Sequence, residues 1–73
     1  SVYPNPGTQF CFIASDLGEI QRVTAVNQLG QQTKLPFDQI HNQADLRNLA
    51  PGLYFFNIQL SSGKRMFTRF MKQ

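Results

Sequence analysis

The sequence contains few of the residues that form disulfides or bind structural metals in small proteins. Its 73 residues include a single cysteine, Cys11, which removes any intramolecular disulfide. The only histidine, His41, has no cysteine near it in the sequence, so no zinc-ligand spacing is present and no metal site is expected. Stability must come from apolar packing, for which seven Phe and two Tyr supply large side chains. We expect one small domain spanning residues 1–73.

Charge is also scarce, and this limits the expected partners. Seven basic and four acidic residues give a net charge of +3, which is low for a nucleic-acid-binding domain. Basic and aromatic residues do alternate in FFNIQLSSGKRMFTRFMK, but that spacing also suits a packed core, and Lys64, Arg65 and Lys72 are expected to form a solvated rim. We therefore expect no nucleic-acid partner. No apolar run has transmembrane length, and no segment has the pattern of a signal peptide.

The sequence offers little for catalysis. His41 lies in a polar stretch without an adjacent nucleophile, so a solvated loop histidine is expected. Cys11 falls on the strand face assigned to the core, which indicates a buried, unreactive thiol. The acidic residues are scattered, and there is no glycine-rich phosphate loop. We expect neither an enzyme nor a cofactor.

The chain reads as short strands separated by turns. TQFCFIA places Cys11 and Ile13 on one side, and EIQRVTAVN does the same with Val23 and Ala25. NQLGQ is a predicted turn in which glycine takes a positive φ. QTKLPF is a predicted edge strand, because proline cannot donate to a central ladder. Asp45–Leu49 is predicted to form one helical turn capped by its aspartate.

The strongest strand signal is GLYFFNIQL, which alternates apolar residues before the turn SSGK and the segment RMFTRFMK. A three-residue loop, Ser62–Lys64, is predicted to place Phe56 opposite Phe70 and Leu60 opposite Met66. The fold class predicted from these strands is all-β, a small immunoglobulin-like antiparallel β-sandwich of about seven short strands. The second face of the hairpin is expected to be exposed and either to pack against the parent protein or to dock a partner; it carries Leu53, Phe55, Phe67 and Met71.

Three landmarks in order, VYPNP, NQLGQ and LRNLAPGLYFFNI, followed by a basic last strand, together resemble the type A C-terminal sorting domain of the type IX (Por) secretion system. The resemblance covers essentially the whole chain. Arg69 stands where relatives usually have Lys. The family's pattern falls on Tyr3, Pro4, Asn5 and Pro6, on Leu29, Gly30 and Gln31, on Leu46, Leu49, Gly52 and Tyr54, and on Lys72.

The resemblance implies that the domain is a non-catalytic sorting signal. Similar domains are read by the outer-membrane translocon and its shuttle protein after the parent protein reaches the periplasm. In many relatives a sortase then removes the domain and joins the cargo to an anionic surface lipopolysaccharide, so the parent is expected at the outer membrane, on the cell surface or in the medium. The chain lacks an initiator methionine, and we expect it to be a fragment of a longer exported protein.

Three further expectations stay open. An immunoglobulin-like carbohydrate- or protein-binding accessory module of a cell-surface enzyme is the alternative function, and it requires an exposed aromatic platform. The exposed hairpin face makes self-association conceivable. Pro4 and Pro6 favour extended neighbours, which would either separate the signal from its cargo or shape the entry to the first strand.

Overall fold

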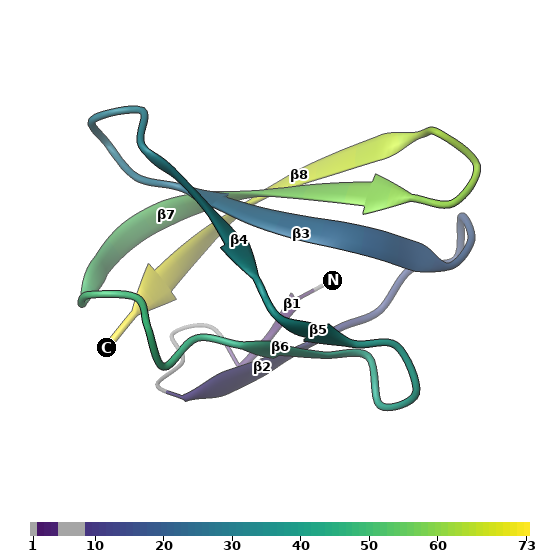
Figure 1. Ribbon diagram of the computed structural model, residues 1–73, viewed down its shortest axis with the longest axis horizontal. Helices are drawn as coiled ribbons and strands as arrows, with labels where there is room; N and C mark the ends of the chain where they lie inside the picture. The colour runs from purple at the N-terminus through teal and green to yellow at the C-terminus, as the bar shows by residue number, and fades with distance from the viewer. Residues whose placement is uncertain (1, 5–8) are drawn as a thin grey trace.

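The structure, a computed structural model, describes residues 2–4 and 9–73 and contains eight strands but no helix within those ranges (Figure 1). In that part of the chain no helical segment could cross a bilayer. The strands are β1 (Val2–Tyr3), β2 (Phe10–Ile13), β3 (Ile20–Val26), β4 (Gln32–Leu35), β5 (Phe37–Asp38), β6 (Gln43–Asp45), β7 (Gly52–Leu60) and β8 (Arg65–Lys72).

The strands form two antiparallel four-stranded sheets that face each other (Figure 1). The short-strand sheet has the order β1-β2-β6-β5, and the long-strand sheet has the order β4-β3-β7-β8. The predicted all-β antiparallel sandwich is therefore confirmed.

The predicted strand QTKLPF is divided between the two sheets. β4 ends at Leu35 on one edge of the long-strand sheet, as predicted, but Phe37 begins β5 in the short-strand sheet. Pro36 lies between them and has no N–H to continue the β4 ladder. Its carbonyl oxygen accepts a hydrogen bond from the Asp45 amide at 2.9 Å. The eight observed strands also include β1 and β6, which the sequence analysis did not identify.

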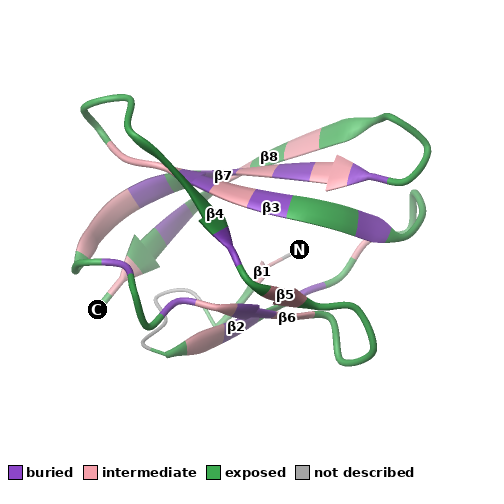
Figure 2. Ribbon diagram, viewed as in Figure 1, coloured by how far each residue is buried: buried purple, intermediate pink, exposed green. Residues whose placement is uncertain are grey.

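The core is built from alternate residues of the long strands and the short strands (Figure 2). The rings of Phe56 and Phe70 stack at its centre, with centroids 4.8 Å apart and planes inclined by 17°. Burying each such ring contributes roughly 1.5–3 kcal/mol. Met66, also predicted to face the core, is only partly buried. The other inward positions predicted from the alternation are buried, namely Cys11, Ile13, Val23, Ala25, Tyr54, Phe56, Ile58, Leu60 and Phe70.

The hairpin between β7 and β8 closes one residue earlier than predicted. Its loop is Ser61–Gly63, because the Leu60 amide donates to the Lys64 carbonyl at 2.8 Å. Three-residue loops place a left-handed residue last, and here that residue is Gly63, with φ +92°. The predicted loop would have put a lysine there.

The predicted pairing of Phe56 with Phe70 is therefore wrong. Phe56 lies opposite Thr68, and Phe70 lies opposite Tyr54. The predicted pairing of Leu60 with Met66 is wrong in the same way, since Met66 pairs with Ile58. The shift is two residues, so each side chain keeps its predicted face.

The predicted helical turn at Asp45–Leu49 is wrong as well. Asp45 is the last residue of β6, so its backbone is extended. A tight turn follows, in which the Leu49 amide donates to the Leu46 carbonyl at 2.9 Å. The Asp45 carboxylate accepts from the Arg47 amide at 3.0 Å, so its predicted capping of the turn does occur.

Candidate recognition surface

The first motif begins inside the fold. Tyr3 lies in β1 opposite Phe12, and the two rings stack with centroids 5.7 Å apart. Pro4 follows the strand directly, whereas Asn5 and Pro6 lie outside the described residues. Tyr3 is therefore part of the short-strand sheet, and a spacer role for the prolines stays a prediction.

The NQLGQ turn between β3 and β4 is held by one side chain. The Asn27 carboxamide oxygen accepts from the amides of Leu29 and Gln31, both at 2.9 Å. Its nitrogen donates to the Gln31 side chain at 2.8 Å, and Gly30 has the predicted positive φ of +83°. Leu29 at the tip is 84% exposed, so the fold gains almost no burial from its apolar side chain.

The LRNLAPGLY motif is mostly structural. Leu46 and Leu49 are buried in the core. The hydroxyl of Tyr54, itself buried, donates to the Ala50 carbonyl at 2.7 Å and ties β7 to the preceding turn. Gly52 begins β7 with φ +150°, a conformation that other residues rarely adopt.

The second and third motifs meet at one end of the sandwich. One surface hollow is lined by Asn27, Gln28 and Leu29 from the β3–β4 turn and by residues 50–54 at the start of β7. A neighbouring hollow shares Leu53 and adds Arg69 from β8. We call this region, at the left of Figure 1, the motif end. It comprises Leu29, Gly30, Gly52, Leu53, Tyr54, Arg69 and Lys72.

The hairpin outer face, formed by Leu53, Phe55, Phe67 and Met71, has the predicted exposure. Phe67 is 71% exposed, Phe55 47% and Met71 42%, while Leu53 is half-buried. Leu53 pairs with Met71 across the strands, and Phe55 pairs with Arg69, so a cation interrupts the apolar stripe. Self-association through this face stays a prediction that light scattering tests.

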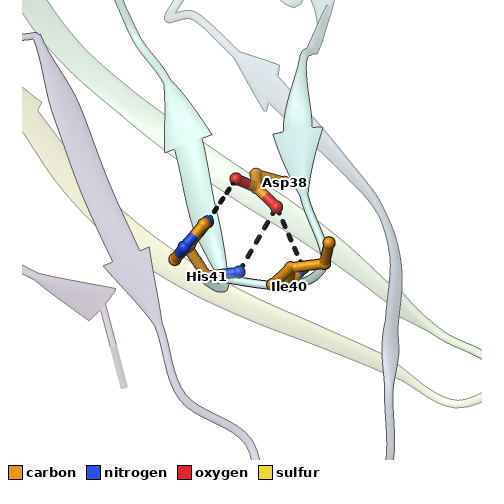
Figure 3. Close-up of polar contacts among 3 residues, drawn as sticks. All are labelled: Asp38, Ile40 and His41. Atoms are coloured by element: carbon orange, nitrogen blue, oxygen red, sulfur yellow. Dashed lines mark hydrogen bonds and ion pairs between the residues drawn. The ribbon is translucent and has the colours of Figure 1, made fainter.

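The only histidine is exposed in the loop between β5 and β6, as predicted, but it has a partner that the sequence analysis missed (Figure 3). Its Nδ1 lies 2.7 Å from an Asp38 carboxylate oxygen, and the other oxygen accepts from the amides of Ile40 and His41. The hydrogen bond from the His41 side chain is the main reason that the pKa of Asp38 lies below its usual value. This i, i+3 pair stabilises a turn, and no group of three metal-ligating side chains occurs within the described ranges.

Cys11 has the environment of a structural thiol. Its side chain is fully buried, and burial raises its pKa to about 12. The thiol is therefore protonated at neutral pH and shielded from reagents. The predicted buried cysteine is confirmed.

The two four-stranded antiparallel sheets place the chain in the class of small β-sandwich domains. A fold of this class does not by itself indicate a function. The family model of the secretion system C-terminal sorting domain matches residues 1–73, the whole chain, and the chain belongs to that family. No curated protein and no solved structure matches it.

Membership gives the domain its general role. It is a type IX secretion sorting signal, a non-catalytic tail that interacts with the secretion machinery. The signal directs export across the outer membrane to the cell surface or the medium.

Proposed function

We propose that residues 1–73 form a single sorting domain of a longer exported protein, and that the outer-membrane translocon and its shuttle protein bind the domain at the motif end. The parent protein passes through the periplasm, and a sortase removes the domain after export. The observation that supports this proposal is the hollow shared by the NQLGQ turn and the start of β7, which joins motif positions more than 20 residues apart in sequence.

Leu29 is the most informative residue of this site. Its turn is already satisfied by Asn27, so a polar residue at the tip would fold as well. An 84% exposed leucine beside a hollow offers apolar surface that a partner's apolar pocket would remove from water. Arg69 and Lys72 bring positive charge to the same end, which favours a partner with an acidic rim.

The hairpin outer face extends this contact along the sheet. Leu53 belongs both to the motif end and to the hairpin outer face, so the two surfaces are continuous. Phe55 and Phe67 offer rigid aromatic area that loses little conformational entropy on binding.

An export assay in a bacterium with the type IX system tests the motif end. Residues 1–73 are fused behind a periplasm-directed fluorescent reporter and compared with the variant Leu29→Ser. Deleting the last strand would be a poor test, because it removes Phe70 from the core and would unfold the domain. The matched control is Leu17→Ser, which changes another exposed leucine, one that lies in a different loop and lines neither hollow.

We expect the Leu29→Ser fusion to accumulate in the periplasm, while the wild type and the Leu17→Ser control reach the surface or the medium. Purified variants with unchanged circular dichroism would exclude misfolding as the cause. Equal export of both variants would locate recognition away from the motif end.

Sortase removal is tested separately by mass spectrometry of the exported fusion. We expect cargo without residues 1–73 in a wild-type strain and cargo that keeps them in a strain lacking the sortase. Retention of the domain in both strains would contradict removal while leaving the export role intact.

A further inference from the structure

A polar hollow lies on the outer face of the long-strand sheet and shares no lining residue with the two hollows of the motif end. Its lining side chains come from all four strands of that sheet, and each of them carries a hydrogen-bonding group. The lining residues are Arg22, Thr24, Gln32, Asn57, Gln59 and Arg65.

Two arginines flank this hollow. Arg22 on β3 pairs with Gln59 on β7, which pairs in turn with Arg65 on β8, so the two guanidinium groups lie in one cross-strand row. The row spans two strand spacings, or about 10 Å. Both arginines are exposed, and no acidic side chain in residues 2–4 and 9–73 forms an ion pair with either. An anion seated between them would be attracted by both charges.

A buried acceptor lies in the adjacent row. Asn57 lies between Thr24 and Phe67, and its carboxamide oxygen is buried without a hydrogen-bond partner. The oxygen is closed to solvent, so a bound molecule can supply the missing donor only when the Asn57 amide turns toward the hollow that it lines. Phe67, 71% exposed beside it, offers an apolar ring face.

We propose that this hollow binds a sugar unit bearing a carboxylate. The carboxylate lies between Arg22 and Arg65, a hydroxyl group donates to the Asn57 oxygen, and the C–H face of the ring packs on Phe67. The side chain of an acidic peptide has only acceptor oxygens, so a peptide could satisfy the Asn57 oxygen only through a backbone N–H, whereas a sugar carries hydroxyl donors on the same ring as its carboxylate. The proposal gives a definite site to the carbohydrate-binding alternative raised by the sequence, and it does not rest on recognition at the motif end.

A nuclear magnetic resonance titration of the ¹⁵N-labelled chain tests the site. The probes are methyl β-D-glucuronide, the neutral methyl β-D-glucoside, inorganic phosphate and a hexaglutamate peptide. We expect saturable shifts at Thr24, Asn57 and Gln59 with the glucuronide. We expect affinity at least about tenfold lower for the glucoside, because it lacks the charge-assisted bonds.

Variants distinguish binding by the two arginines from a general attraction of the anion to positive charge. Arg22→Gln and Arg65→Gln are each expected to weaken glucuronide binding by about tenfold. The matched control is Lys64→Gln, which removes the same charge at the residue that follows the hairpin loop and should change affinity by less than about twofold. Asn57→Leu should weaken binding by a similar factor to the arginine variants, and well-dispersed spectra verify that each variant is folded.

Four results would overturn the proposal. If the glucoside bound as tightly as the glucuronide, the site would not recognise the carboxylate. If phosphate bound as tightly, the hollow would be a simple anion site. Tighter binding of hexaglutamate would assign the hollow to an acidic peptide. Shifts centred on the stacked Tyr3 and Phe12 would move sugar binding to the short-strand sheet.

Discussion

The two sheets share one core but differ in strand length and in charge. Strands of the short-strand sheet have two to four residues, whereas β3, β7 and β8 have seven, nine and eight. No strand of the long-strand sheet contains an acidic residue, and its cations are Arg22, Lys34, Arg65, Arg69 and Lys72. The acidic residues are Asp38 in β5, Asp45 in β6, and Asp16 and Glu19 in the loop before β3.

This difference separates the residues that stabilise the fold from those of the proposed recognition surfaces. The inner faces of both sheets follow the same apolar alternation, so either sheet covers the core. In the part of the chain that the structure describes, the outer face of the long-strand sheet carries both exposed aromatic residues, Phe55 and Phe67, and the exposed cations Arg22 and Arg65. Substitutions on its two faces should therefore have different consequences.

The largest expected effect distinguishes those faces directly. Phe56→Ala removes a fully buried ring and should lower the free energy of unfolding by about 3–5 kcal/mol. Much of the stability of so small a domain would be lost. Phe67→Ala, in the partner strand but 71% exposed, should change it by less than about 0.5 kcal/mol. Urea denaturation measures both, and similar losses would mean that the outer face also carries stability.

The next effect concerns backbone strain in the NQLGQ turn, measured as the stability of variants at Gly30. Gly30→Ala should cost about 1–2 kcal/mol, because φ +83° is unfavourable for alanine although nothing crowds the new methyl group. Gly30→Asn should cost less, since asparagine tolerates this region better. Thermal unfolding measures the order, and equal stability of all three proteins would place the strain elsewhere.

Tyr54→Phe should have a smaller effect. It removes the hydrogen bond from the tyrosine hydroxyl to the Ala50 carbonyl and should cost about 0.5–1.5 kcal/mol. The control Tyr3→Phe changes a ring that is 53% exposed in the short-strand sheet and should be near neutral. The comparison is made by urea denaturation, and an equal loss in both variants would mean that the Ala50 bond contributes nothing.

The smallest effect concerns pH and lies in the short-strand sheet. The folded pKa of Asp38 is below its unfolded value of 3.8, chiefly because of the hydrogen bond from the His41 side chain. Its stabilising contribution is therefore fully present above that unfolded pKa and is lost as the pH falls through the lower folded pKa. Asp38→Asn should flatten the fall in unfolding free energy at acid pH, and His41→Ala should do the same. An unchanged acid profile in both variants would contradict this role.

Much of the fold was predictable because the alternation of apolar and polar residues along a strand can be recognised from neighbouring residues in the sequence. Cys11, Val23 and Phe56 could be assigned to the core from their neighbours in sequence alone. The division at Pro36 was not predictable, since nothing local indicates that Phe37 pairs with Ala44 in the other sheet. The hairpin register was predicted wrongly because two loops of equal length differ only in where their glycine falls.

The candidate surfaces depended still more on long-range pairing. The motif residues were identified from the family pattern, but the hollow that Leu29 shares with the start of β7 depends on how β3 and β7 pair. The row from Arg22 to Arg65 also requires the irregularity in β3 between Ile20 and Arg22, which sets which side chains share that face. Sequence patterns do not specify such a bulge.

The single proline between β4 and β5 has a mechanical consequence. Leu35 and Phe37 belong to opposite sheets and are only two residues apart, so neither sheet can separate from the other without pulling that link. The domain should open as one cooperative unit, with amide protons of both sheets losing protection from hydrogen exchange together. The translocon would then meet either the folded domain with its complete recognition surface or an unfolded chain without one.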